Sequence, residues 1–271
     1  MSRSYLFIPG NTPSMLQNLD VFESDCVIID FEDSVMSYDK DAARILVRNF
    51  LEKYNFDNMK VFIRINDSES PHFLEDVKAT NDLNITGYVL PKALPNSVEQ
   101  LNLITDKQII PIIESPMAVL RAEDIANKPN IRGILLGAED LTKELGINRT
   151  LEATEILFTR SRLVLIANAY GIESIDTPFT SKDSEEDLLI DCNNAKHLGF
   201  TSKSSIHPNH VDTINTVFAP SEDEIFESQR IVAKAKELNK GAFSLDGKMV
   251  DLPIIEKAEK LLEKAKKYNL L

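Results

Sequence analysis

The chain has 271 residues, of which 43% are hydrophobic and 27% are charged, the balance of an ordinary globular protein. Its formal net charge of −13 argues against nonspecific binding to nucleic acid, which requires a basic surface. No apolar run reaches the roughly 18 residues of a membrane span, and the N-terminus lacks the long apolar region of a secretory signal, so we expect a cytoplasmic protein with no membrane partner.

Short apolar runs of strand length recur along the chain, and helical patterns such as 41–54 and 151–170 lie between them. Alternation of this kind predicts an α/β fold with a parallel sheet, and about eight units favour a (β/α)8 TIM barrel. No Gly-rich dinucleotide or phosphate-binding motif follows a strand, which argues against a Rossmann fold. The last two runs are the weakest strand candidates and are included partly because they complete the count. The expected strands are 5–8, 26–31, 61–65, 88–90, 109–113, 134–136, 172–175 and 205–206.

The pattern changes after Pro220, which divides the chain into a barrel domain of residues 1–220 and a short C-terminal helical extension of residues 221–271. The segment from Ser221 to Glu224 is a capping-box signature for a helix that runs to about Leu238. Residues 239–248 are rich in turn formers and predict a hairpin, and a final helix begins at 252–253. We expect the extension to fold over the barrel mouth or over a neighbouring subunit.

Polar side chains dominate the ends of the expected strands, where a parallel barrel gathers its active-site residues. Carboxylates belong at strand ends because burying one inside an apolar strand has a heavy desolvation cost. The spatial convergence of these residues depends on the barrel itself. They are Asp30, Glu32, Asp33, Arg64, Asn66, Lys92, Glu114, Glu139, Asp140, Ser205 and His207.

Glu114 and Asp140 follow two successive strands and predict a shared Mg²⁺ site, because Mg²⁺ prefers oxygen ligands from one or two carboxylates, waters and substrate. No His–Cys cluster lies nearby to favour zinc. A metal held in this way leaves room for a chelating 2-oxo or 2-hydroxy carboxylate, which Arg64 would grip with two hydrogen bonds. Each acid alone fits a surface ion pair or a helix N-cap equally well, and Asp140 is a plausible N-cap. Lys92 also fits a solvated loop lysine, and His207 a turn residue.

Several segments resemble the citrate lyase β-subunit family, which belongs with the HpcH/HpaI-type aldolases and includes malyl-CoA and citramalyl-CoA lyases. The similar segments run in order from residue 3 to about residue 260. They are Arg3-Ser-Tyr-Leu-Phe-Ile-Pro-Gly10, Asp30-Phe-Glu-Asp-Ser34, Arg64-Ile-Asn66, Leu90-Pro-Lys92, Ile113-Glu-Ser-Pro116, Leu136-Gly-Ala-Glu-Asp-Leu141, Gly199-Phe-Thr-Ser-Lys-Ser-Ser-Ile-His-Pro208 and Gly247-Lys-Met-Val-Asp251.

The resemblance implies a Mg²⁺-dependent barrel that cleaves or forms a carbon–carbon bond next to a coenzyme A thioester. By motif, Glu114 and Asp140 occupy the metal-ligand positions, and Arg64 grips the 2-oxo acid. Glu32 and Asp33 match acids that orient metal-bound water. The implied reaction is retro-Claisen cleavage of a citryl-, malyl- or citramalyl-CoA type 3-hydroxyacyl-CoA to a 2-oxo acid and an acyl-CoA.

The resemblance also assigns residues to the coenzyme A side. Lys203 falls in the segment that lies near coenzyme A in the family, with Arg3 and Lys92 assisting. Asp251 matches an acid that relatives supply from a neighbouring subunit for proton transfer at the thioester α-carbon. A homo-oligomer, trimer or hexamer, is therefore expected. Ser202 and His210 depart from the family pattern near this side.

Other functions remain open from the sequence. Water admitted near the thioester would make the protein a malyl-CoA thioesterase, and an aldolase for hydroxy-keto acids would need no coenzyme A. A citrate lyase β subunit would act on a thioester carried by an acyl-carrier partner. A catalytically inactive binding protein fits least well, because every matched acidic position is present.

Overall fold

A closed barrel of eight parallel strands forms the first part of the computed structural model, which describes residues 1–271 except 1, 55, 57–58, 182–183 and 239–240. The strands pair in chain order, and β8 pairs with β1 to close the barrel. The predicted (β/α)8 TIM barrel is therefore confirmed. The strands are β1 (Ser4–Pro9), β2 (Cys26–Asp30), β3 (Lys60–Arg64), β4 (Gly87–Leu90), β5 (Gln108–Ile113), β6 (Gly133–Leu136), β7 (Glu173–Asp176) and β8 (Ser202–Ser205).

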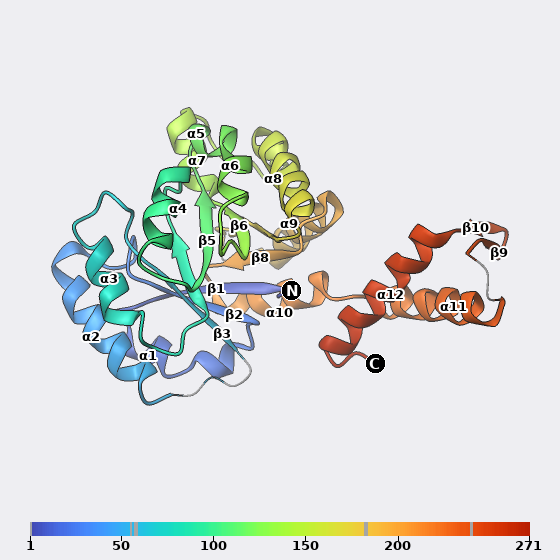
Figure 1. Ribbon diagram of the computed structural model, residues 1–271, viewed down its shortest axis with the longest axis horizontal. Coiled ribbons are helices and arrows are strands. Elements are labelled where there is room, and N and C mark those ends of the chain that lie inside the picture. The colour runs from blue at the N-terminus through green and yellow to red at the C-terminus, as the bar shows by residue number, and fades with distance from the viewer. Residues whose placement is uncertain (1, 55, 57–58, 182–183, 239–240) are drawn as a thin grey trace. The chain divides into compact units, whose positions relative to one another are not determined.

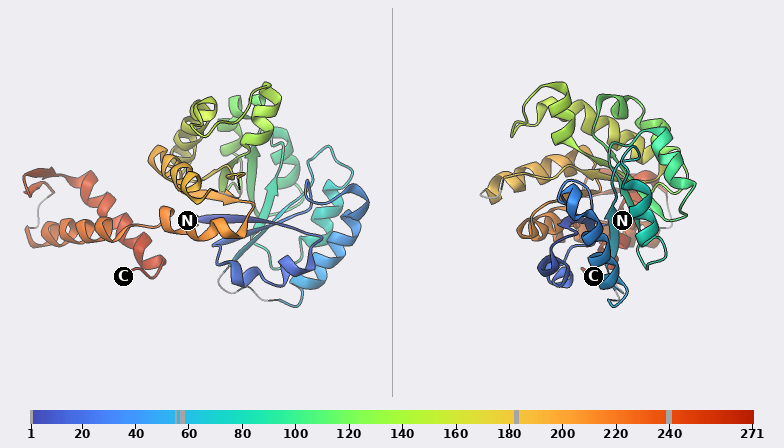
Figure 2. Two further views of the ribbon diagram at one scale, coloured as in Figure 1. Left: turned by 180° about the vertical axis from the view of Figure 1, so that it is seen from behind. Right: turned by 90° about the vertical axis from the view of Figure 1, so that its left-hand side faces the viewer.

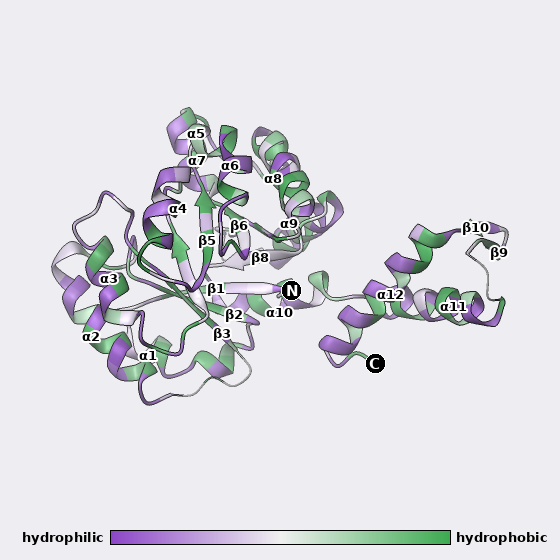
Figure 3. Cartoon of the chain, viewed as in Figure 1, coloured by the Kyte–Doolittle hydropathy of each residue, from purple (hydrophilic) through white to green (hydrophobic). Residues whose placement is uncertain are grey.

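Apolar side chains fill both faces of the barrel wall, as expected for parallel strands covered by helices. Tyr5, Ile28, Phe62, Ile110 and Ile175 belong to a cluster of alternate strand residues that packs inside the barrel. A larger cluster packs between the strands and the surrounding helices. Figure 3 shows most of β5 as hydrophobic, whereas α8 carries both hydrophobic and hydrophilic residues.

The helices lie outside the strands in the views of Figures 1 and 2. The expected helix 41–54 is observed as α2, and the expected helix 151–170 as the short turn η3 followed by α8. The helices of this part are α1 (Pro13–Leu16), η1 (Leu19–Phe22), η2 (Ser37–Asp39), α2 (Lys40–Leu51), α3 (Phe73–Thr80), α4 (Pro95–Asn102), α5 (Pro116–Leu120), α6 (Ala122–Ala126), α7 (Ala138–Leu145), η3 (Thr154–Ile156), α8 (Leu157–Tyr170), α9 (Glu185–Leu198), η4 (Pro208–His210) and α10 (Val211–Phe218).

The strand β8 begins three residues before its predicted position, 202 in place of 205. Its sequence Ser-Lys-Ser-Ser has no apolar residue, yet all four residues are buried. Hydrogen bonds make this burial possible: the Ser204 hydroxyl donates to the Asp176 carbonyl at 2.7 Å, and the Ser202 hydroxyl donates to the Ser174 carbonyl at 3.2 Å.

The chain divides into two compact units, residues 1–215 and 216–271. In the second unit, α11 (Glu222–Leu238) begins with the predicted capping box, in which Glu224 N–H donates to the Ser221 hydroxyl at 3.2 Å and Ser221 N–H to the Glu224 carboxylate at 2.9 Å. The antiparallel strands β9 (Phe243–Leu245) and β10 (Lys248–Val250) confirm the hairpin, except that residues 239–240 lie outside the described part. The last helix is α12 (Leu252–Lys267). Among the described residues, no helix is long and apolar enough to cross a membrane.

Candidate active site

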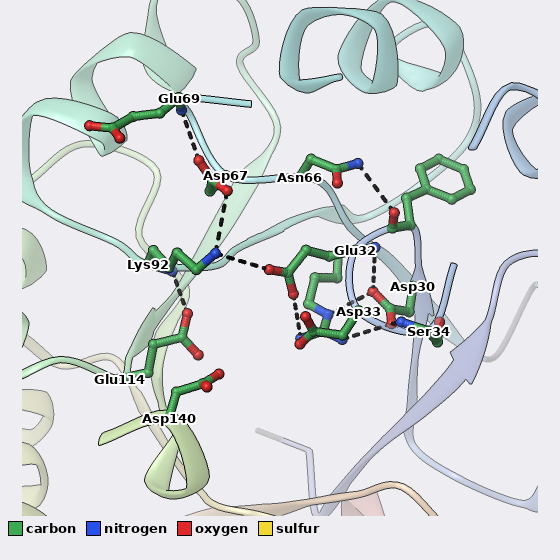
Figure 4. Close-up of polar contacts among 12 residues, drawn as sticks. Asp30, Glu32, Asp33, Ser34, Asn66, Asp67, Glu69, Lys92, Glu114 and Asp140 are labelled. Carbon is green, nitrogen blue, oxygen red and sulfur yellow. Dashed lines mark hydrogen bonds and ion pairs between the residues drawn. The ribbon is translucent and has the colours of Figure 1, made fainter. Parts of the chain in front are cut away.

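A cavity of about 390 Å³ opens at the carboxyl ends of the barrel strands. Its wall takes Asp30 from β2, Arg64 from β3 and Glu114 from the end of β5, together with the first turn of α7 up to Asp140. The side chains at this edge form a group that we call the acid rim. The acid rim consists of Asp30, Glu32, Asp33, Arg64, Glu114 and Asp140. Figure 4 labels the five acids of this group.

Arg64 is the centre of one half of the acid rim. Its guanidinium donates to both carboxylate oxygens of Asp30 at 2.7 Å and contacts Glu32 at 2.9 Å and Asp33 at 3.2 Å. Burial would lower the pKa of Arg64, but these three carboxylates raise it. Burial and the neighbouring Asp33 and Asp30 nevertheless raise the pKa of Glu32 to about 8, because one guanidinium cannot offset three acids.

The main chain of the loop between β2 and α2 fixes the direction of these acids. The Asp30 carboxylate accepts the backbone N–H groups of Glu32 at 2.8 Å and Ser34 at 3.0 Å. Lys40, buried at the start of α2, donates its ammonium to the carbonyls of Phe31 at 2.7 Å and Glu32 at 3.0 Å. The loop is thus held from both sides.

Glu114 and Asp140 form the other half of the acid rim and lie beside each other in Figure 4. Lys92 N–H donates to Glu114 Oε1 at 2.5 Å from a left-handed backbone with φ 48°. Gly137 is required here, because a Cβ on it would lie 2.7 Å from Glu114 Oε2. Burial first, and then the charge of Asp140, raise the pKa of Glu114 to about 7. The alternative that Asp140 is a helix N-cap is wrong, since α7 begins two residues earlier and Gly137 is its N-cap.

Two carboxylates and a raised carboxyl pKa fit a divalent cation with oxygen ligands. In the part of the chain that the structure describes, no group of three or more His, Cys, Asp or Glu side chains could hold a metal ion. The protein would therefore supply two ligands, Glu114 and Asp140, and leave the other positions to water and substrate. This is the ligand pattern of Mg²⁺ and not that of structural zinc.

Lys92 lies at the exposed edge of the acid rim. Its Nζ is 3.7 Å from Glu32 and 3.5 Å from Asp67, and 61% of its side chain is exposed. Lys92 is therefore a solvated loop lysine, which was the alternative left open by the sequence, and also a cation beside the site. Figure 4 shows its side chain pointing toward Glu32 and Asp67.

Lys203 does not line the cavity, and its predicted contact with coenzyme A stays a prediction. Lys203 lies on the outer face of β8, where its side chain is fully buried. Its Nζ donates to Asp176 at 2.6 Å and contacts Asp191 at 2.7 Å, and Arg160 bonds to the same two acids. We call this group the buried ion network, which consists of Arg160, Asp176, Asp191 and Lys203.

Arg3 also lies away from the cavity lining. It precedes β1 and therefore lies at the amino ends of the strands, opposite the cavity. Its guanidinium and its backbone N–H both bind the carboxylate of Asp25, at 2.7 to 3.0 Å. The predicted assistance of Arg3 in coenzyme A binding stays a prediction.

Asp251 lies in the second unit, outside the barrel. It is the N-cap of α12, and its side chain accepts the backbone N–H of Ile254 at 3.3 Å. The predicted role of Asp251 in a neighbouring subunit stays a prediction.

Sequence reasoning missed three contributors to the site: Lys40, Gly137 and Phe7, whose ring centroid is 5.1 Å from the Arg64 guanidinium carbon. Gly137 stands in the Leu-Gly-Ala-Glu-Asp segment between a strand and an acid, which was a signal of close packing. No sequence signal marked Lys40, because its function depends on two main-chain carbonyls.

An eight-stranded barrel with an acid-rich cavity at the carboxyl ends of its strands is the arrangement of a TIM-barrel enzyme. The sequence family described as HpcH/HpaI aldolase/citrate lyase matches residues 3–208, and the chain belongs to this family. The resemblance and the enzyme class predicted from the sequence are thereby confirmed.

Relatives carry two kinds of name. The citrate lyase subunit beta of Leuconostoc mesenteroides subsp. cremoris is 32% identical over 288 residues, which cover 100% of this chain and 95% of that protein. The mitochondrial citramalyl-CoA lyase of Rattus norvegicus is 26% identical, covering 96% of this chain and 85% of that protein. The crystal structure of CitE from Mycobacterium tuberculosis with magnesium, acetoacetate and coenzyme A has a TM-score of 0.84 and 27% identity, with 97% of each chain covered.

Proposed function

We propose that the protein is a Mg²⁺-dependent carbon–carbon lyase that cleaves a 3-hydroxyacyl-CoA to a 2-oxo acid and an acyl-CoA. The observation that carries the proposal is the pairing of Glu114 with Asp140 in one cavity with Arg64. The magnesium and coenzyme A in the similar Mycobacterium tuberculosis structure support it.

The residues of the acid rim would have three roles: metal binding, substrate binding and orientation of water. Glu114 and Asp140 would hold Mg²⁺, which supplies Lewis-acid polarisation of the substrate oxygen. Arg64 would share its guanidinium between Asp30 and the carboxylate of the 2-oxo acid half. Glu32 and Asp33 would orient water that takes the hydroxyl proton as the carbon–carbon bond breaks.

The leaving acyl-CoA must gain a proton at its α-carbon. We assign this step to Asp251 of a neighbouring subunit, which requires the predicted homo-oligomer, a trimer or hexamer. Lys92 is the exposed cation that we assign to the coenzyme A side. Analytical ultracentrifugation tests the oligomer, and mixing Asp251→Asn chains with Arg64→Ala chains tests the shared site: activity should recover only in mixed oligomers.

The main test is an assay with malyl-, citramalyl- and citryl-CoA, with Mg²⁺ present and then chelated. Asp140→Ala should lower kcat/KM about 10²–10³-fold. The substitution removes one of the two carboxylates that would hold Mg²⁺, and the charge of Mg²⁺ would stabilise the transition state. The matched control is Asp124→Ala, which removes an exposed carboxylate of α6 that is ion-paired with Arg121. This variant should leave kcat/KM nearly unchanged. Full Mg²⁺-dependent turnover by Asp140→Ala would contradict the metal assignment.

Product analysis separates the rival activities. With malyl-CoA, glyoxylate and acetyl-CoA indicate cleavage, whereas free malate indicates a thioesterase. The relatives named citrate lyase subunit beta favour one further candidate, a subunit that acts on a thioester of an acyl-carrier protein. Turnover that appears only when carrier protein is added would support that candidate.

A further inference from the structure

We infer that the cavity selects a 2-oxo acid with one negative charge and a small apolar substituent, such as pyruvate, over a dicarboxylate such as oxaloacetate. This inference rests on the proposed function, because it takes the 2-oxo acid to lie between Arg64 and the paired carboxylates. The names of the relatives do not decide the point, since they include both citrate lyase subunits and citramalyl-CoA lyases.

The wall of the cavity toward the barrel interior is apolar. Ile112 from β5 and Leu135 from β6 are buried and line the cavity, and Phe7 from β1 lies under the Arg64 guanidinium. Ile206, directly after β8, extends this surface to the exposed edge, where 42% of the residue is accessible. A methyl group on the 2-oxo acid would be buried on this wall, whereas a carboxylate there would lose its water without gaining a cation.

The charge of the cavity also disfavours a second carboxylate. Among the described residues that line it, Arg64 is the only side-chain cation, and Asp30 already takes two of its hydrogen bonds. A divalent cation adds two positive charges. Arg149, which does not line the cavity, pairs with Glu139 at 2.9 Å, so the other four lining carboxylates face three positive charges. The lining carboxylates are Asp30, Asp33, Glu114, Glu139 and Asp140.

Two exposed lysines beside the acids do not remedy this imbalance. Lys143 Nζ, on a side chain that is 84% exposed, lies 3.9 Å from Asp140. Lys92 does not line the cavity, and its Nζ lies between Glu32 and Asp67 at 3.7 and 3.5 Å. One carboxylate of a ligand can therefore be neutralised by Arg64 and the metal. A second carboxylate would meet acids or the apolar wall.

Citramalyl-CoA and citryl-CoA form a matched pair for the test, because they differ only by a methyl against a carboxymethyl group on the carbon that bears the hydroxyl. With saturating Mg²⁺, kcat/KM for citramalyl-CoA should exceed that for citryl-CoA by about tenfold or more. Equal or faster cleavage of citryl-CoA would overturn the inference.

Calorimetric titration of the Mg²⁺-loaded protein with pyruvate and with oxaloacetate separates this inference from the proposed function. Tighter binding of pyruvate than of oxaloacetate supports the inference, whether or not the thioesters are cleaved. Failure to cleave either thioester would reject the proposed lyase function but not this inference. Tighter binding of oxaloacetate, or no binding of either acid, overturns it.

A variant at the edge of the apolar wall tests the physical cause. Ile206→Arg places a cation beside the cavity and should shift the ratio of citryl-CoA to citramalyl-CoA cleavage about tenfold toward citryl-CoA. Ile206→Met has a similar length without charge and should keep the original preference. An unchanged ratio in Ile206→Arg would show that charge does not set the selection.

Discussion

The acid rim and the buried ion network are built from the same kinds of residue, yet they differ in charge balance. The buried ion network has two cations and two carboxylates, joined at 2.6–2.9 Å within the wall behind β7 and β8. The acid rim has one guanidinium against five carboxylates and borders a cavity.

The pKa values express this difference. In the buried ion network, burial would raise the pKa of Asp191, but Lys203 and Arg160 outweigh it and lower the pKa to about 2. In the acid rim, burial and like charges raise the pKa of Glu32 to about 8 and that of Glu114 to about 7. A balanced cluster stabilises the fold, whereas an unbalanced one needs a proton or a metal ion, which is what a binding site requires.

The largest expected effect comes from breaking the balanced cluster. Lys203→Met should lower the free energy of unfolding by about 3–5 kcal/mol, because it leaves Asp176 and Asp191 buried with one cation between them. Urea denaturation measures this change. Lys78→Met, at an exposed pair with Glu75, is the control and should cost less than about 1 kcal/mol. A similarly small change in Lys203→Met would mean that the network is not structural.

The acid rim should respond in the opposite way to pH. The folded pKa of Glu114, about 7, lies above its ordinary value of 4.5, so the folded protein binds more protons between these limits. The stability of the Mg²⁺-free protein should therefore fall as the pH rises through this window. Asp191 has a lowered pKa, so the stability it contributes is present above 3.8 and lost only as the pH falls toward about 2.

Magnesium binding should release the proton of the Glu114 carboxyl group, whose pKa is about 7. Because Mg²⁺ needs the deprotonated carboxylate, its affinity should rise with pH up to about 7, by at most about tenfold per pH unit. Calorimetric titration at about pH 5.5, 6.5 and 7.5, in buffers of different ionisation enthalpy, measures both the affinity and the released proton. Glu114→Gln should bind Mg²⁺ weakly and without this pH dependence. A pH-independent affinity in the unmodified protein would contradict the assignment.

The contrast also explains which residues the sequence could place. Seven strands were predicted within two residues of their observed bounds. Six of them have apolar runs that are buried on both faces, whereas β7 was included partly to complete the count. Arg64 and Glu114 were found because polar residues end such runs. The strand β8 has no apolar residue, so its start was misjudged, whereas the assignment of Lys203 to the coenzyme A side came from the family resemblance. Ile206 lines the cavity, and alternation along the strand therefore puts Ser204 on the inner face and Lys203 on the outer face.

Contacts between distant segments were beyond the sequence for a different reason. Nothing in the pattern around Asp30 or Asp191 tells how many cations will lie beside each one, since the partners come from other strands and helices. The charge balance that separates a structural cluster from a binding cluster appears only when the barrel closes.

The smallest expected effect concerns Lys40, a buried cation that binds the main chain of the loop carrying Glu32 and Asp33 of the acid rim. It is 8% exposed, and burial lowers its pKa although nearby acids oppose that shift. Lys40→Met removes both bonds to the carbonyls of Phe31 and Glu32 and should lower stability by about 1–3 kcal/mol. If Lys40 positions Glu32, kcat should also fall several-fold while KM for substrate changes little.

The control for this variant is Lys53→Met, at an exposed lysine just after the same helix, which should leave both stability and kcat unchanged. Lys40→Arg keeps a donor and a charge and should restore part of kcat. A loss of stability without any loss of kcat would mean that Lys40 has only a structural role, like the cations of the buried ion network. A loss of kcat that Lys40→Arg partly restores would instead mean that Lys40 positions the loop that carries Glu32 and Asp33 of the acid rim.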